Sequence, residues 1–282
     1  MSLMSKLLST TLIVTLSLSA SSESDVKEYI QKHMVKSPRV KVESVDIIDK
    51  QTLSEPNGWE AYFVNIHANI KKSATVTDKV TVPETVFVKD GFAAPSLIDM
   101  KTGEDFKISL KPKLKSEIYD DKHLFAGNKD AKHKIVIFSD PQCPFCQEKV
   151  PEIYKAVKAN PETLSLYYYH FPLLRIHPVS DVITRVMVLE QEKKNFDKVM
   201  EMYSLKIDAH ETDVTKILNK INKDFDLKIT EKDIDEPRIA DEIKHDKEMA
   251  TKSMVAGTPT VYIDGKWDKS RNGYKKLIPE DN

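Results

Sequence analysis

The hydrophobic pattern of the chain differs between its two halves, and the first half has the periods of a helix followed by strands. Val26, Ile30 and Met34 recur at every fourth position, which predicts one face of a short helix. Residues 62–70 alternate apolar and polar side chains, as in a strand with one buried face. Shorter strands are predicted at four apolar pairs: Val40/Val42, Val45/Ile47, Val80/Val82 and Val86/Val88. We therefore expect a helix packed on an antiparallel sheet.

The second half predicts strands and helices in alternation. Its first element, residues 135–138, is a continuous apolar run, typical of a strand buried on both faces. The later elements are expected as a helix starting just after Cys143, a strand at 164–171, a helix at 179–186, polar helical sequence over 190–254, and a strand at 261–263 closed by the hairpin turn Asp264-Gly265. This order predicts a mixed α/β sheet with a helical insertion.

The two halves are separated by a charged stretch, and an apolar segment precedes both. Residues 111–127 predict a solvated connector, so we expect one domain over 21–110 and another over 128–282. Residues 1–20 carry a single charge, Lys6, then an apolar run and small residues, which is the order of a secretory signal peptide. The run is shorter than the ~20 apolar residues that span a bilayer. We expect export to an oxidising compartment.

Composition narrows the possible functions. Among 282 residues, 40% are hydrophobic and 31% are charged, which argues against disorder. The formal net charge of −1 gives no reason to expect a nucleic-acid partner. None of the seven glycines falls in a dinucleotide-binding or phosphate-loop pattern, so no cofactor is expected.

Both cysteines lie in one motif, Asp140-Pro141-Gln142-Cys143-Pro144-Phe145-Cys146. A zinc site would need two further ligands, and the sequence has neither a second cysteine pair nor paired histidines at ligand spacing, so no metal is expected. A purely structural disulfide would close a tiny loop and gain little by loop closure. A redox pair at a helix N-terminus is the interpretation we favour. There, unpaired N–H groups and the helix dipole would stabilise a Cys143 thiolate.

A second motif, Ala256-Gly257-Thr258-Pro259-Thr260, directly precedes the last strand. Proline is expected at the first position of a strand or at a bend, because it has no N–H for the ladder. A cis Thr258–Pro259 bond would bring the backbone close to the cysteine pair and leave Thr258 free to pair with an extended substrate. A plain loop proline is the alternative.

Together, these motifs resemble a known family. Phe138-Ser139-Asp140-x-x-Cys-Pro-Phe-Cys with Gly257-Thr258-Pro259-Thr260 is similar to the thioredoxin-fold Dsb proteins of bacterial periplasms, and closest to the DsbC/DsbG branch. Residues 171–173 and 177–178 are similar to DsbA-like members instead. The resemblance implies an α+β protein: a C-terminal thioredoxin-like domain with a helical insertion, a smaller N-terminal helix-and-sheet domain, and a homodimer joined through the latter.

The resemblance also implies roles for individual residues. Cys143 would be the exposed nucleophile and Cys146 the resolving thiol. Thr258, Pro259, Pro144 and Phe145 would contact the substrate, with Pro259 as the cis-proline.

Two departures from the family pattern bear on the chemistry. Ile137 stands where thioredoxins and DsbA have a buried acid, so the group that exchanges a proton with Cys146, Asp140 or a water, is left open. Phe145 stands where DsbA has a histidine. This predicts a Cys143 pKa that is lowered less than in DsbA.

The leading hypothesis is a periplasmic thiol:disulfide interchange enzyme that forms or isomerises disulfides in unfolded or misfolded exported proteins. A membrane redox partner would reset the cysteine pair. The alternative is a periplasmic holdase chaperone with a structural disulfide. A cytosolic thioredoxin-type reductase is a third hypothesis, against which the predicted signal peptide argues.

Overall fold

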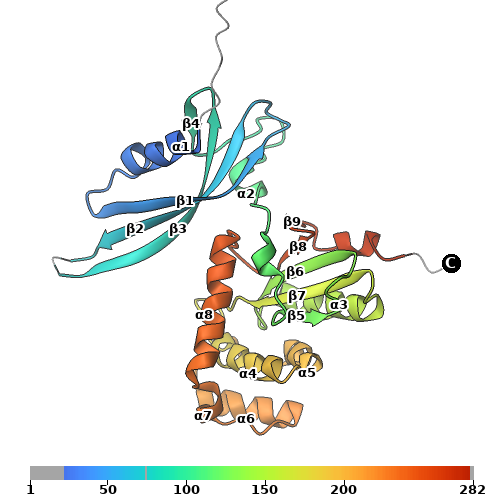
Figure 1. Ribbon diagram of the computed structural model, residues 1–282. Helices are drawn as coiled ribbons and strands as arrows, with labels where there is room; N and C mark the ends of the chain where they lie inside the picture. The colour runs from blue at the N-terminus through green and yellow to red at the C-terminus, as the bar shows by residue number, and fades with distance from the viewer. Residues whose placement is uncertain (1–21, 74, 280–282) are drawn as a thin grey trace, which may run out of the picture.

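The computed structural model describes residues 22–73 and 75–279, which form two units joined by a connector (Figure 1). The predicted signal peptide, residues 1–20, lies outside the described residues. Within the described ranges, no helix is both long enough and apolar enough to cross a membrane.

The N-terminal unit is a helix on a four-stranded antiparallel sheet of order β1-β2-β3-β4. Its elements are α1 (Glu23–Tyr29), the π-helix η1 (Ile30–Met34), β1 (Val40–Thr52), β2 (Glu60–Lys71), β3 (Thr77–Lys89) and β4 (Phe92–Ala94). The helix and the antiparallel sheet are confirmed, but the four predicted short strands are two long ones. In β1 the register shifts between Val42 and Ser44 and again between Ile47 and Asp49, which breaks the alternation.

Both faces of the N-terminal sheet are covered at its centre. On one face Val26 and Ile30 of the helix pack against Tyr62 and other apolar side chains. On the other face Phe63 packs with Phe87 under the segment that contains α2 (Phe106–Ser109). The prediction of a half-buried strand was therefore wrong for the first half of β2, because the chain after β4 folds back over the second face.

The C-terminal unit is a five-stranded mixed sheet of order β5-β7-β6-β8-β9. Its strands are β5 (Leu124–Ala126), β6 (His133–Ser139), β7 (Leu164–His170), β8 (Thr260–Ile263) and β9 (Lys266–Trp267). The central strand β6 is parallel to β7 and antiparallel to β8. β5, within the stretch expected to be a connector, pairs with β7 at the edge of the sheet.

Helices cover this sheet as predicted, with an insertion between β7 and β8 (Figure 1). They are η2 (Ser116–Ile118), α3 (Pro144–Ala159), α4 (Ser180–Glu192), α5 (Phe196–Glu201), η3 (Met202–Ser204), α6 (Val214–Phe225), α7 (Glu231–Ile234), α8 (Pro237–Lys252) and η4 (Gly273–Lys276). Ile135 and Ile137 face the core formed with α3 and α4, while Val136 and Phe138 face a second core of tyrosines. Because β6 contributes side chains to both cores, its apolar run is continuous. The predicted α+β class is confirmed.

The connector binds the two units to each other. The Lys111 ammonium donates to the Met254 carbonyl at 2.8 Å. The backbone carbonyl of Lys111 accepts from the Gln51 side chain at 2.9 Å. The Lys113 backbone N–H donates to Asp49 at 2.8 Å. Met254, which follows α8, also packs against the N-terminal core. The C-terminal end of α8 therefore lies next to the N-terminal sheet.

Candidate active site

The two cysteines lie where β6 ends and α3 begins. Cys143 is the residue that caps the helix, and Pro144 is its first residue. The Cys143 carbonyl accepts hydrogen bonds from the N–H groups of Cys146 at 2.9 Å and Gln147 at 3.0 Å, which closes the first turn. Proline suits this position because its fixed φ matches a helix and its missing N–H would have no partner there. The predicted strand–motif–helix arrangement is confirmed, and both cysteines are free thiols.

The cysteine pair meets a second segment that is far away in sequence. The Cys143 thiol donates to the carbonyl of Thr258 at 3.4 Å, across 115 positions of the chain. The Thr258–Pro259 bond is cis, as predicted, and Pro259 is buried. Cys143 is 6% exposed and Cys146 is 0% exposed. The expectation that Cys143 is exposed was therefore wrong, because the segment at Thr258 covers it, and Cys146 is buried more deeply still.

The surroundings of the two sulfurs push their pKa values apart. Hydrogen bonding from the Cys146 thiol, together with the backbone N–H groups of Cys146 and Phe145, outweighs burial and lowers the pKa of Cys143 to about 5. Burial, together with the neighbouring Cys143 thiolate, raises the pKa of Cys146 above its ordinary value. At neutral pH the pair therefore holds one thiolate and one thiol, which is the arrangement of a nucleophile and a resolving group.

The Cys143 thiolate is expected to titrate with a pKa near 5, because its largest stabilising contact is the Cys146 thiol. Ultraviolet thiolate absorbance followed against pH measures this value. Cys146→Ala removes that contact and is expected to raise the pKa. A wild-type value of about 3.5, as in DsbA, or of about 8.5, as in a free cysteine, would contradict this assignment.

Asp140 holds the loop before the cysteines and is saturated with hydrogen bonds. One of its carboxylate oxygens accepts from Gln142 N at 2.8 Å and Ser180 Oγ at 2.7 Å. The other accepts from Leu173 N at 2.8 Å and His177 Nδ1 at 2.9 Å. Four donors fill the acceptor sites of a buried carboxylate. Asp140 therefore ties the motif to α4 and to the preceding loop and has no free lone pair for Cys146.

Sequence reasoning missed the side chains that border the resolving cysteine. Hydrogen bonding from the Ser139 side chain counteracts the raised pKa of the Cys146 thiol. The Tyr203 hydroxyl in turn donates to Ser139 Oγ at 2.6 Å. Ser139 was visible in the sequence only as part of the family motif, and Tyr203 lies in the stretch 190–254, where polar helical sequence was expected.

An apolar rim lies next to the pair. Phe145 is 62% exposed, Pro144 is also exposed, and the Arg271 guanidinium lies 5.6 Å from the centre of the Phe145 ring. Ile176, also exposed, belongs to the loop whose Leu173 is held by Asp140. No sequence signal distinguished Arg271 or Ile176. The rim thus exposes apolar side chains within and beside the cysteine motif.

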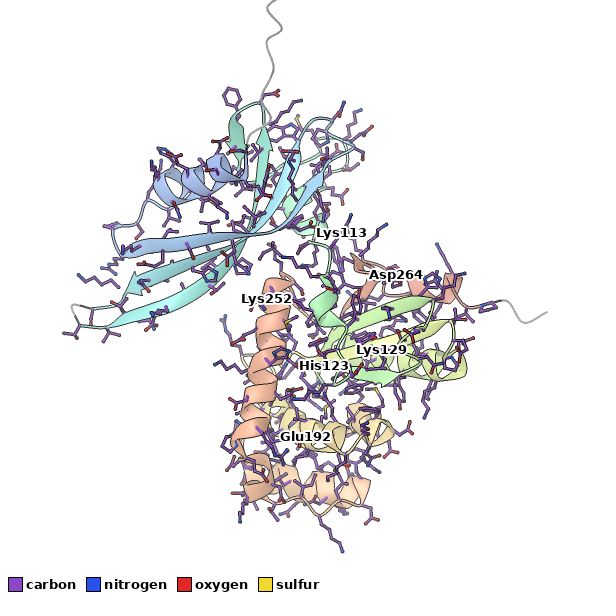
Figure 2. All side chains as sticks on the ribbon, in the orientation of Figure 1. Lys113, His123, Lys129, Glu192, Lys252 and Asp264 are labelled. Carbon is purple, nitrogen blue, oxygen red and sulfur yellow. The ribbon has the colours of Figure 1, made fainter. Side chains whose placement is uncertain are left out.

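Two groups of potential metal ligands occur in the described part of the chain; both include His123, and neither includes a cysteine. His123 Nδ1 contacts Asp120 at 2.8 Å, and Nε2 contacts Asp246 at 2.9 Å (Figure 2). Burial opposes a charge on His123, but hydrogen bonds to Asp120, Asp246 and Glu242 raise its pKa to about 11. The cluster is a buried ion-pair centre, in which the imidazolium is paired with three carboxylates.

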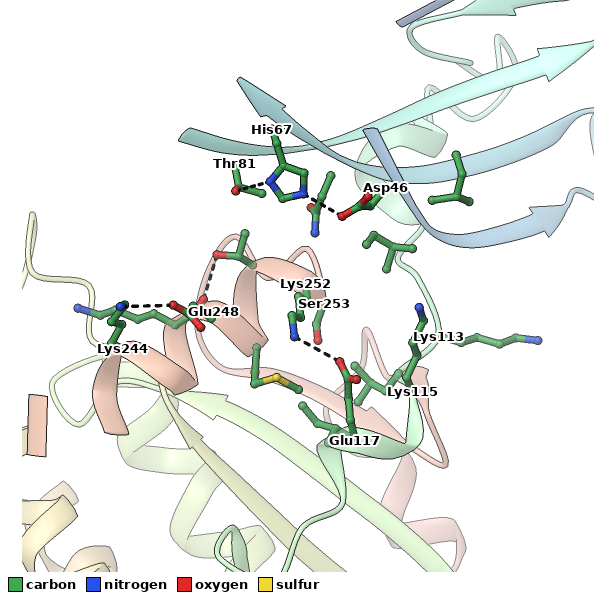
Figure 3. Close-up of a pocket in the computed structure, with 18 of the residues that line it drawn as sticks. Asp46, His67, Thr81, Lys113, Lys115, Glu117, Lys244, Glu248, Lys252 and Ser253 are labelled. Carbon is green, nitrogen blue, oxygen red and sulfur yellow. Dashed lines mark hydrogen bonds and ion pairs between the residues drawn. The ribbon is translucent and has the colours of Figure 1, made fainter. Parts of the chain in front are cut away.

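A cleft of about 1060 Å³ separates the N-terminal sheet from α8 (Figure 3). Asp46, His67 and Thr81 line its upper wall, where the imidazole contacts Asp46 at 2.9 Å and Thr81 at 3.0 Å. On the lower wall Lys252 pairs with Glu117 at 3.6 Å. Neither cysteine is among the lining residues of this cleft. Four ion pairs form among its lining residues: His67–Asp46, Arg185–Asp181, Lys244–Glu248 and Lys252–Glu117.

Comparisons with known proteins concern the C-terminal unit. A family model described as thioredoxin matches residues 120–278. Similar solved structures include a thioredoxin-like oxidoreductase from Silicibacter pomeroyi, with 21% identity over 55% of this chain and 87% of that chain and a TM-score of 0.43. BdbD from Bacillus subtilis has 17% identity over 60% and 93%, with a TM-score of 0.47. The thiol-disulfide exchange protein α-DsbA2 from Wolbachia pipientis has 22% identity over 57% and 87%, with a TM-score of 0.43. No curated protein matches.

Proposed function

The chain belongs to the thioredoxin family, whose model matches residues 120–278, and on this premise we propose that it is a Dsb-type thiol:disulfide oxidoreductase. The match confirms the predicted thioredoxin-like domain. In the proposal, the Cys143-Pro144-Phe145-Cys146 pair forms or isomerises disulfides in exported proteins. The observation that carries the proposal is the division of the two sulfurs into a low-pKa thiolate at Cys143 and a buried thiol at Cys146.

The proposed chemistry is a pair of exchange steps. The Cys143 thiolate attacks one sulfur of a substrate disulfide, forming a mixed disulfide and releasing the other sulfur as a thiolate. Cys146 then attacks Cys143 Sγ, which releases the substrate reduced and leaves the protein oxidised. In the reverse direction of these steps, the oxidised cysteine pair transfers its disulfide to a substrate dithiol. A lowered Cys143 pKa stabilises the reduced protein and so favours this oxidising direction.

The substrate is proposed to lie against Thr258, Pro259, Pro144 and Phe145. The Thr258 carbonyl, 3.4 Å from Cys143 Sγ, is main-chain polar surface beside the reactive sulfur. An extended polypeptide pairs with such a backbone edge without regard to its own sequence. Exposed Phe145 adds an apolar contact that many unfolded chains satisfy. These properties suit a broad range of unfolded or misfolded substrates.

The N-terminal unit is proposed to join two copies of the chain. Its short edge strand β4 and the following segment carry four exposed apolar side chains: Phe92, Ile98, Met100 and Ile108. Exposed apolar side chains grouped at a sheet edge favour association. Export through the predicted signal peptide would place this dimer in the periplasm, where a membrane redox partner would reset the pair.

A redox titration of the full chain without residues 1–20 is the experiment that tests the proposal. A reduction potential above about −300 mV is expected for an exchanging pair, whereas a lower value marks a structural disulfide and favours the holdase alternative. Refolding of reduced ribonuclease reports oxidase activity, and refolding of scrambled ribonuclease reports isomerase activity. Mass by light scattering measures the oligomer in the same sample. A potential below −300 mV with no effect on either refolding reaction would overturn the proposal.

A further inference from the structure

Three buried hydroxyl groups form a chain that ends at Cys146. Ser139 is the last residue of β6, Tyr203 lies in η3, and Tyr168 lies in β7. The Tyr168 and Tyr203 oxygens are 2.6 Å apart, and the Tyr203 and Ser139 oxygens are also 2.6 Å apart. All three side chains are buried. Distances this short are those of well-formed O–H···O hydrogen bonds.

The direction of each hydrogen bond follows from the number of protons. A hydroxyl has one proton to donate, and Tyr203 donates its proton to Ser139 Oγ. The bond between the tyrosines is therefore donated by Tyr168. Because Ser139 accepts from Tyr203, its own proton remains available for donation, and hydrogen bonding from its side chain counteracts the raised pKa of Cys146. The hydroxyl chain therefore ends in a donor beside the Cys146 sulfur.

The resolving step needs such donors. Cys146 has to become a thiolate, at least transiently, in a site with no exposure to water. Ile137, at the position of the family's buried acid, packs in the apolar core. Asp140 is saturated by its four donors. Burial raises the pKa of both tyrosines, so their hydroxyls stay protonated and remain donors.

We propose that the Ser139–Tyr203–Tyr168 hydroxyl chain stabilises the developing Cys146 thiolate in the resolving step, in place of the absent buried acid. Ser139 is then a catalytic residue, because it contacts a reacting sulfur, and the two tyrosines are positioning residues. In this step the Cys146–Cys143 S–S bond forms and the Cys143–substrate S–S bond breaks. The leaving substrate sulfur takes up the proton that Cys146 gives up. The inference rests on the proposed function.

A symmetric aryl disulfide such as dithiobis(nitrobenzoate) separates the two steps, because each step releases one coloured thiolate. The first release reports attack by Cys143, and the second reports attack by Cys146 on the mixed disulfide. In Ser139→Ala the second release is expected to slow by about tenfold, since one hydrogen bond to a charged group is lost. Tyr203→Phe is expected to slow it less, and Tyr168→Phe least. The first release stays at the wild-type rate in all three.

The pH profile of the second release distinguishes stabilisation of a thiolate from a purely structural role. The titratable groups around Cys146 and its hydroxyl chain are Cys143, Asp140, Tyr168, Tyr203 and His170, whose ring centre lies 4.9 Å from that of Tyr168. Ser139→Ala and Tyr203→Phe are expected to move the midpoint of the profile to higher pH. A network that only supports the fold would leave that midpoint unchanged.

Matched controls remove similar groups outside the chain. Tyr262→Phe deletes a buried tyrosine hydroxyl that donates to the Ser253 carbonyl, and Ser165→Ala deletes a buried serine hydroxyl in β7. Both controls are expected to leave the second release unchanged. The inference is overturned if Ser139→Ala and Tyr203→Phe release the second thiolate at the wild-type rate, or if both steps slow equally. An effect of Ser139→Ala alone would overturn the role of the tyrosines. Absence of the first release in the wild-type protein would instead contradict the proposed function.

Discussion

Replacing Cys143 with serine is expected to abolish thiol–disulfide exchange. A serine hydroxyl is not ionised near neutral pH, whereas the Cys143 pKa of about 5 makes the sulfur a thiolate under the same conditions. Cys146 cannot take over, because it is fully buried and its pKa is raised. Refolding of scrambled ribonuclease with the Cys143→Ser protein is expected to fall to the rate in buffer alone. A variant that retains wild-type activity would contradict the mechanism.

Cys146→Ser is the matched variant for this prediction. It keeps the nucleophile and removes the resolving thiol, so the first step proceeds and the substrate stays attached to Cys143. Mass spectrometry is expected to detect the mixed disulfide in this variant and not in Cys143→Ser. Both reduced variants are expected to unfold at the wild-type denaturant concentration, which separates loss of chemistry from loss of fold.

Replacing the buried His123 with alanine is expected to cause a large loss of unfolding free energy. The imidazole is almost fully buried and contacts Asp120, Asp246 and Glu242. Asp246 also accepts the His170 backbone N–H at 2.7 Å, so the cluster joins the segment before β5, the end of β7 and α8. Removing the cation leaves the buried Asp246 carboxylate without its ion-pair partner, while Glu242 keeps its ion pair with Lys122. Breaking a buried ion pair in this way costs about 3–5 kcal/mol.

Urea unfolding of the full chain measures this difference, and His67→Ala is the matched control. His67 pairs with Asp46 at 2.9 Å on a solvent-exposed face of the N-terminal sheet. An exposed pair of this kind contributes about 0–1 kcal/mol. The two variants therefore remove the same side chain from a buried and from an exposed ion pair. Equal losses of unfolding free energy would contradict the assignment of His123 as the buried ion-pair centre.

The effect of His123→Ala is also expected to depend on pH. The His123 pKa is raised to about 11, so its contribution is full below the unfolded value of about 6.5 and is lost as pH rises toward 11. Contacts with His123 overcome burial and lower the pKa values of Asp120 and Glu242 to about 2, so their contribution is lost as pH falls from about 4 toward 2. The difference in unfolding free energy between the variant and the wild type should be largest between about pH 4.5 and 6.5. A difference that does not change with pH would contradict this account.

Local patterns were sufficient for the elements that carry the cysteines. An apolar run ending at Phe138, followed by Pro144 within the motif, predicts a buried strand and a helix start, and β6 and α3 have that arrangement. Asp264 and Gly265 predict the turn between β8 and β9, and both have the positive φ that such a turn needs. These features depend on residues within a few positions of one another.

Hydrophobic patterns over longer stretches were partly misleading, because they do not show which distant segment packs on them. The register shifts in β1 split one strand into two apparent ones. The alternation of residues 62–70 suggests that the face of β2 that carries Phe63 is exposed. The segment around Phe106 covers that face instead. Periodicity reports how a segment alternates, and it does not report which distant segment packs on it.

The sequence by itself was enough to select Cys143 as the proposed nucleophile, because a helix N-terminus and the cysteine spacing are local properties. Only the tertiary structure decided what surrounds the two sulfurs. Thr258 reaches Cys143 across 115 positions, Asp140 is filled by donors from three segments, and Tyr203 reaches Ser139 from η3. Each of these contacts needs helices and strands packed at one particular position and angle. An apolar stripe that contains Tyr203 specifies burial of the ring, whereas the partner of its hydroxyl depends on which strand end lies within hydrogen-bonding distance.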